Sequence, residues 1–87
     1  MNIEDIEKTI LSAFREKEVM NEVGIDDDFF DLGVSSLTIV ELQIVVEKML
    51  GLEVPTSTLM AAPTIAEWVS VYTEAAKANT SEAATVA

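Results

Sequence analysis

The sequence predicts an all-α fold: a small four-helix bundle with three longer helices, one short helix and a long loop after the first helix. Four segments have apolar residues at helical spacing, and glycine, proline or helix-capping residues separate them. The chain has 87 residues, of which 49% are hydrophobic, so it can form one small domain with one modest core.

The first helix is expected to begin after Asn2, because asparagine is favoured as an N-cap. Its apolar stripe consists of Ile3, Ile6, Ile10, Leu11 and Phe14. Residues 18–35 then form a long loop, since Gly24, Gly33 and three consecutive aspartates oppose a regular element. We expect the apolar residues of this loop to pin it across the helices: Val19, Met20, Val23, Ile25, Phe29, Phe30 and Leu32.

The second helix is expected from about Ser36 to Leu50, with Gly51 as its terminating glycine. Its apolar face is wide and consists of Leu37, Val40, Leu42, Ile44, Val45, Val46 and Met49. The β-branched run at residues 44–46 makes a strand the local alternative, but the length of the segment and the closing glycine favour a helix.

Pro55 and Pro63 bracket a segment with room for only one or two turns of helix. The last helix is expected to begin at Thr64, because a capping box is formed by Thr64 as N-cap and Glu67 three residues later.

The end of the chain is small and weakly patterned, so the sequence predicts a domain over residues 1–77 and a flexible C-terminal tail over residues 78–87. Because the chain starts with methionine and ends in this loose tail, we expect a complete protein rather than a piece of a larger synthase.

The charge of the chain excludes several partners. Sixteen acidic and five basic residues give a net charge of −11, which repels nucleic acid and anionic membranes and attracts basic protein surfaces. Residues 18–34 contain six acidic residues and no basic one, so this segment is either a solvated loop or a docking surface. No apolar run approaches the roughly 18 residues of a membrane span, and no signal-peptide pattern opens the chain. The chain has no cysteine and hence no disulfide, which is compatible with a reducing cytoplasm. We expect a cytoplasmic protein and a monomer.

The chain lacks the residues for most autonomous catalysis. It contains no histidine and no cysteine, so a Ser-His-Asp triad is impossible and a zinc site is not expected. Asp26 and Asp28 resemble the start of a calcium loop, but the third ligand and the following glycine are missing. We expect no catalytic residue and no metal site, and hence no enzyme.

Ser36 has two interpretations from the residues alone. Serine is common as the N-cap of a helix. A serine at a helix start could also be the attachment point of a phosphate-bearing group, because unpaired N–H groups and the helix dipole favour anions there. The surrounding acidic residues would oppose such an anion, so the modification would need a dedicated enzyme.

Five short segments form a wider pattern: Phe29-Phe30-Asp31-Leu32-Gly33, Ser36-Leu37, Val40-Glu41-Leu42, Gly51-Leu52-Glu53-Val54-Pro55 and Pro63-Thr64-Ile65-Ala66-Glu67. In this order and spacing they resemble the acyl and peptidyl carrier proteins over roughly residues 3–75. The resemblance implies that Ser36 carries 4′-phosphopantetheine, which a phosphopantetheinyl transferase adds from coenzyme A. The thiol of this arm would hold an acyl or aminoacyl group as a thioester.

The resemblance also implies that the helix after the serine recognises partner enzymes, with these exposed contacts: Asp31, Leu37, Val40, Glu41 and Glu47. The family usually has aspartate just before the modified serine, where this chain has Ser35. Because leucine follows the modified serine in the family pattern, Leu37 selects Ser36 rather than Ser35.

From these observations we expect a free-standing acyl carrier protein that delivers thioester intermediates to loading and processing enzymes with basic docking surfaces. Ser35 and the Phe29-Phe30 pair favour polyketide or hybrid biosynthesis over fatty-acid synthesis. The alternatives are a peptidyl or aminoacyl carrier of non-ribosomal peptide synthesis, and an acidic helical interaction module that is never modified.

Overall fold

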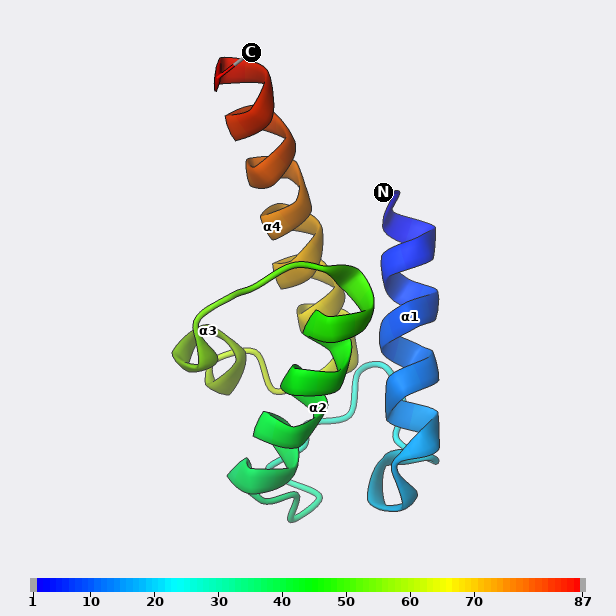
Figure 1. The fold of residues 1–87 in the computed structure, drawn as a ribbon. Helices are drawn as coiled ribbons and strands as arrows, with labels where there is room; N and C mark the ends of the chain where they lie inside the picture. Colours follow the sequence, from blue (N-terminus) through cyan, green and yellow to red (C-terminus); the bar gives the residue numbers. More distant parts are fainter. Residues whose placement is uncertain (1, 87) are drawn as a thin grey trace.

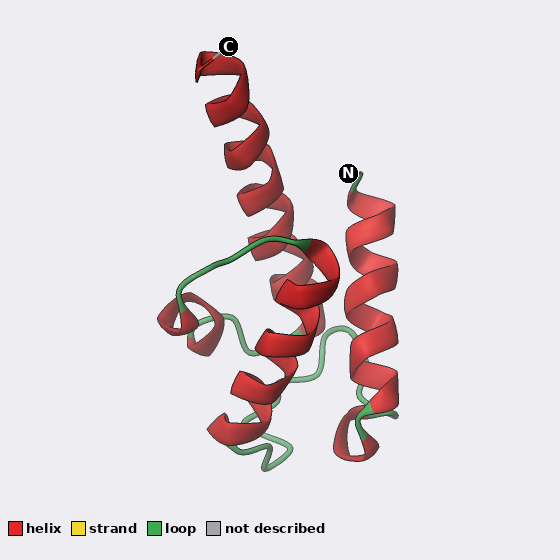
Figure 2. Cartoon of the chain, in the orientation of Figure 1, coloured by secondary structure: helices red, strands yellow, loops and turns green. Residues whose placement is uncertain are grey.

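The computed structural model describes the backbone of residues 2–86 and the side chains of residues 2–18 and 20–78. It contains four α-helices and one 3₁₀ turn: α1 (Ile3–Glu16), η1 (Glu18–Met20), α2 (Ser36–Leu50), α3 (Thr56–Met60) and α4 (Ile65–Val86). The described residues include no strand (Figure 2). The predicted all-α fold with three longer helices, one short helix and a long loop is therefore confirmed.

Three predicted helix boundaries are confirmed by their capping contacts. The Asn2 side chain accepts a hydrogen bond from the Asp5 N–H at 2.9 Å and caps α1. Thr64 Oγ1 accepts one from the N–H three residues later at 3.1 Å, before α4. Gly51 ends α2 with a φ of +68°, a left-handed conformation that glycine adopts without strain.

The last helix is longer than the sequence pattern indicates. α4 continues to Val86 and extends beyond the other helices (Figure 1). The side chains of residues 79–87 lie outside the described part of the chain. The division into a domain over residues 1–77 and a flexible tail over residues 78–87 stays a prediction.

α1 packs against both α2 and α4, and α3 lies beside α2 and α4 (Figure 1). The core between them contains a chain of aromatic rings. The Phe14 ring lies 5.4 Å from the Phe29 ring and 5.0 Å from the Trp68 ring, between ring centres, and Tyr72 lies 6.1 Å from Trp68. All four rings have no exposed surface. Burial of this aromatic area helps to hold the loop and the helices together.

The loop between α1 and α2 is held at three points. Arg15 Nη1 donates to the carbonyl of Val23 at 2.8 Å and to that of Asn21 at 3.0 Å. The Phe29 N–H donates to the Pro63 carbonyl at 2.8 Å, and Ile25 accepts from the first turn of α4. These contacts satisfy backbone groups that a loop would otherwise leave unpaired.

A polar network joins α2, the segment after it and α4. Glu47 Oε2 accepts three hydrogen bonds, from Gln43 Nε2 at 3.1 Å, the Val54 N–H at 3.0 Å and the Tyr72 hydroxyl at 3.0 Å. Gln43 also donates to the Val54 carbonyl at 3.0 Å and accepts from the Thr56 hydroxyl at 2.8 Å. Gln43 is the buried polar residue of the described core, and this network satisfies its amide.

Within the described residues, no helix combines the length and the apolar character needed to cross a membrane.

Tyr72 gives the network a measurable signature. Burial, the hydrogen bond to Glu47 and the negative charge of that carboxylate raise the pKa of the Tyr72 hydroxyl far above its ordinary value. A pKa raised by folding contributes stability below the unfolded pKa of about 10, and that stability is lost as the pH rises above it. Tyr72 is the single tyrosine of the chain, so tyrosinate absorbance reports this group alone.

We predict that tyrosinate forms only together with the loss of helical circular dichroism during an alkaline titration. Tyr72→Phe has no tyrosine, so its alkaline unfolding shows how much stability is lost through lysine titration. It should lose stability less steeply than the wild type above about pH 10. Tyrosinate formation near pH 10 with the helical signal intact would show that the hydroxyl is not held as described.

Candidate functional site

The end of the loop is built to start α2 at a fixed place. Asp28 Oδ1 accepts hydrogen bonds from the N–H groups of Phe30 at 2.8 Å and Asp31 at 3.1 Å, which forms a turn. Gly33 follows with a φ of +81°, which favours glycine. The Val34 N–H then donates to the carbonyl of the buried Phe29 at 3.0 Å. The chain therefore enters α2 from a closed turn that is anchored in the core.

Ser35, and not Ser36, is the N-cap of α2. Ser35 has extended backbone angles, and its Oγ accepts a hydrogen bond from the Thr38 N–H at 3.3 Å. The hydroxyls of Ser35 and Thr38 also lie 3.2 Å apart. The interpretation of Ser36 as the helix cap is therefore wrong, because its neighbour already fills that position.

Ser36 is the first residue of α2, and its side chain is exposed. Within the described part of the chain, no hydrogen bond to its hydroxyl is found. Two adjacent serines thus have different environments: Ser35 stabilises the helix start, and the Ser36 hydroxyl is open to a partner.

The start of α2 offers groups that favour an anion at Ser36 and that act against the surrounding acidic residues. The first turn of α2 contains no acidic residue that would compensate the positive end of the helix dipole. In the described chain, no acceptor is found for the N–H groups of Ser36 and Leu37. A phosphodiester on the Ser36 hydroxyl would lie close to these donors.

Four of the five predicted partner contacts lie near Ser36 or on the outward side of α2. Asp31 and Leu37 are exposed, and 68% of the Leu37 surface is accessible to solvent. Val40 is half-buried. Glu41 is exposed, but its Oε1 lies 2.7 Å from Lys17 Nζ, so an ion pair already offsets its charge.

Glu47 does not fit the expectation of an exposed contact. It is half-buried, and its Oε2 is the acceptor at the centre of the polar network described above. The side chain is turned inwards because three donors converge on one oxygen. Its position identifies a structural role that helical spacing could not reveal.

The exposed side of α2 contains several residues of the wide apolar face that the sequence predicts. Ile44 is 62% exposed, Met49 is 52% exposed and Val45 is 41% exposed. The buried face consists of Ile39, Leu42, Gln43, Val46 and Leu50. Since nearly every position of this helix is apolar, periodicity could not separate the two faces. The solvent face of α2 is therefore unusually apolar, which is a feature typical of interaction surfaces.

In the described residues, no group of three or more acidic side chains is placed to hold a metal ion. The loop aspartates instead form backbone turns: Asp28 as above, and Asp27 by accepting from the Gly24 N–H at 2.8 Å.

The comparison with protein families identifies the family of the chain. The family of the phosphopantetheine attachment site matches residues 8–71, which include the whole of α2. The chain belongs to this family. Its members carry covalently attached 4′-phosphopantetheine, so the cofactor expected from the sequence is confirmed for the family.

Curated relatives are large synthetases. The chain is 42% identical over 60 residues to a dimodular nonribosomal peptide synthase of Bacillus subtilis, which covers 69% of this chain and 2% of that protein. It is 38% identical over 68 residues to surfactin synthase subunit 3 of the same species, and this match covers 78% of this chain and 5% of that protein. It is 34% identical over 61 residues to a probable non-canonical nonribosomal peptide synthetase of Salinispora arenicola, and this match covers 70% of this chain and 1% of that protein.

The chain therefore spans no more than 5% of the length of these three relatives. No solved structure matches the chain. Carrier domains of this family act with phosphopantetheinyl transferases and with synthetase enzymes in general, which supports a carrier role for the chain.

The separate environments of the two serines lead to a stability prediction. Ser35→Ala should lower the free energy of unfolding by about 1 kcal/mol, because it removes an N-cap. Ser36→Ala should change it by less than about 0.5 kcal/mol, since the exposed hydroxyl is not used by the fold. Urea unfolding followed by circular dichroism measures both values.

Ser35→Asp is the matched control, because aspartate also caps helices and should keep most of the wild-type stability. If Ser36→Ala lowered the free energy of unfolding as much as Ser35→Ala does, the assignment of the cap to Ser35 would be wrong.

Proposed function

We propose that Ser36 is the site of 4′-phosphopantetheine attachment and that the chain carries aminoacyl or peptidyl intermediates in non-ribosomal peptide synthesis. The observation that supports this most directly is the exposed Ser36 hydroxyl at the N-terminus of α2, inside the segment matched by the attachment-site family. The attached group supplies a terminal thiol that can hold a carboxylic acid as a thioester.

The attachment step needs only a nucleophilic oxygen from this chain. Ser36 Oγ forms a bond to the phosphorus of coenzyme A on the pantetheine side. The bond from that phosphorus to the bridging oxygen breaks, and 3′,5′-adenosine bisphosphate leaves. The serine proton passes to a base of the transferase, because the chain has no histidine and no described base is hydrogen-bonded to this hydroxyl.

The contribution of the fold to this step is positional. Ser35 keeps the first turn of α2 formed, so Ser36 stays on a rigid element. The unpaired N–H groups of the first turn stabilise the phosphodiester product. A flexible arm on this rigid point then raises the effective concentration of a tethered intermediate at each partner enzyme.

The relatives favour a peptidyl or aminoacyl carrier over an acyl carrier of a polyketide pathway. Two of the three relatives described above are named as nonribosomal peptide synthases or synthetases. We therefore place the peptidyl carrier first, ahead of the polyketide role expected from Ser35 and the Phe29-Phe30 pair. A carrier of this kind performs no chemistry of its own and depends on the transferase and the synthetase.

We further propose that partners contact the outward face of α2 mainly through apolar side chains. Leu37 and Ile44 are spaced by seven residues and lie on the same side of the helix. The charges beside them are nearly balanced, because Lys17 pairs with Glu41 and Lys48 is exposed. Basic groups of a partner would instead meet the acidic loop, where Asp31 is exposed next to the start of α2.

Intact-mass spectrometry tests the attachment. After incubation with coenzyme A and a promiscuous phosphopantetheinyl transferase, the wild-type chain should gain the mass of one phosphopantetheine. Ser36→Ala should gain nothing, and Ser35→Ala should still be modified, although more slowly if its helix start frays.

Two results would contradict the proposal. Modification of Ser36→Ala would move the site to another hydroxyl. No mass gain with several transferases, from a chain whose circular dichroism is that of a folded helical protein, would favour the unmodified interaction module.

A further inference from the structure

The segment from Leu52 to Ala62 connects α2 to α4 and contains the short helix α3; we call it the 52–62 strap. Its two ends are fixed differently from its middle. Gly51 precedes it in the left-handed conformation, and Pro63 follows it with its carbonyl bound to the Phe29 N–H. Both ends are therefore attached to the rest of the fold by backbone hydrogen bonds, since the Gly51 N–H also donates to the Glu47 carbonyl.

The strap has little intrinsic stability of its own. α3 has five residues, far fewer than an isolated helix needs, and no side chain caps its first turn. Its apolar anchors are Leu52, Leu59 and Ala62, of which Leu59 is the single buried residue within α3. Most of the remaining strap is exposed.

The polar network holds the part of the strap between its apolar anchors Leu52 and Leu59. Both backbone groups of Val54 are engaged: its N–H donates to Glu47 Oε2, and its carbonyl accepts from Gln43 Nε2, each at 3.0 Å. Thr56, the first residue of α3, donates to Gln43 Oε1 at 2.8 Å. Side-chain hydrogen bonds thereby connect the strap to α2, in addition to the packing of α3 beside α2.

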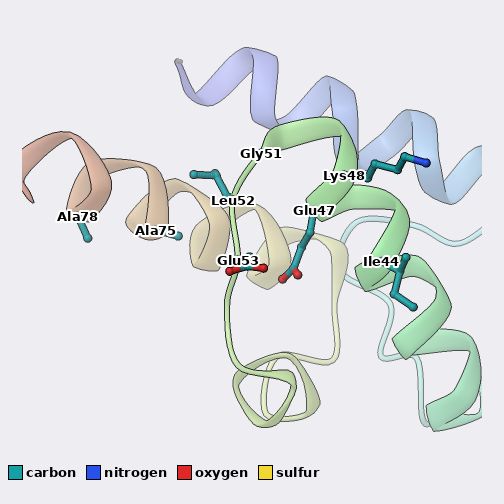
Figure 3. Close-up of a pocket in the computed structure, with 8 residues that line it drawn as sticks. All are labelled: Ile44, Glu47, Lys48, Gly51, Leu52, Glu53, Ala75 and Ala78. Carbon is teal, nitrogen blue, oxygen red and sulfur yellow. The ribbon is translucent and has the colours of Figure 1, made fainter. Parts of the chain in front are cut away.

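The same carboxylate spans a gap between α2 and α4. In the described chain, no Cα atoms of these two helices lie within 8 Å of each other, and the Tyr72 hydroxyl reaches Glu47 across this distance. A hollow of about 790 Å³ lies here, with Glu47 on one side and Leu52 and Ala75 on others (Figure 3). A second groove of about 670 Å³ lies between α3 and α4, and Val54 is part of its lining.

We propose that the 52–62 strap is a separate opening unit of the bundle and that the Glu47 carboxylate is the latch that keeps it closed. The latch has three points, on α2, on the strap and on α4. Its release frees the Val54 N–H and the Tyr72 hydroxyl, so the strap loosens and the groove between α3 and α4 widens, while the aromatic core that joins α1, the loop and α4 stays packed.

Native-state hydrogen exchange resolved by residue tests this proposal. In the wild type, the hydrogen-bonded amides of Val54, Thr58 and Ala62 should exchange faster than those in the middle of α1, because local opening requires less free energy than unfolding. Glu47→Gln and Tyr72→Phe should accelerate exchange in the strap by roughly tenfold or more, since each weakens hydrogen bonds to a charged group. Exchange in α1 should change by less than about threefold.

Glu41→Gln is the matched control, because it removes an exposed glutamate from the same helix and should leave strap exchange unchanged. Thr56→Val tests the edge of the network if Glu47→Gln folds poorly, and should accelerate the exchange of the same amides by a smaller factor.

Two results would overturn the proposal. Equal acceleration of exchange in the strap and in α1 would show that the network only stabilises the whole fold. No acceleration in the strap would show that Glu47 is not a latch. The test needs no transferase, so its result is independent of the modification of Ser36.

Discussion

Phe29 belongs to the loop before α2, yet its ring lies in the core, 5.4 Å from Phe14 of α1 and 6.2 Å from Trp68 of α4 between ring centres. Its backbone carries two further anchors, one to Pro63 before α4 and one to Val34 before α2. One residue thus fixes the loop to both neighbouring helices and sets the point from which α2 begins. The other anchors of the loop, at Arg15 and Ile25, lie further from Ser36 along the chain, so Phe29 is the core contact that restricts the start of α2 most directly.

The two serines differ in what the fold requires of them. Ser35 caps the helix start with its side chain, whereas the Ser36 hydroxyl is exposed and the fold does not use it. In the attachment that we propose, Ser36 supplies the oxygen and a partner enzyme supplies the base. The sequence contains no histidine and no cysteine, which fits this proposal.

Much of the fold could be predicted from local signals. Asn2, Gly51 and the Thr64 capping contact act within a few residues, so their roles follow from residue type and spacing. Other features depend on tertiary packing. The loop residues Phe29 and Phe30 are alike in sequence, yet Phe29 is fully buried and Phe30 is 44% exposed. Likewise, Glu47 was expected to face a partner, and only the positions of the strap and α4 show that it faces inwards.

The central claim is that a single oxygen, Ser36 Oγ, is the acceptor in this chain. The most direct measurement is the location of the adduct on the unsubstituted protein, by fragmentation of the modified peptide in a tandem mass spectrometer with a method that keeps the phosphodiester intact. We expect the fragments on either side of Ser36 to differ by the mass of seryl phosphopantetheine, with Ser35 unmodified. An adduct on Ser35, or on a hydroxyl outside the start of α2, would contradict the account.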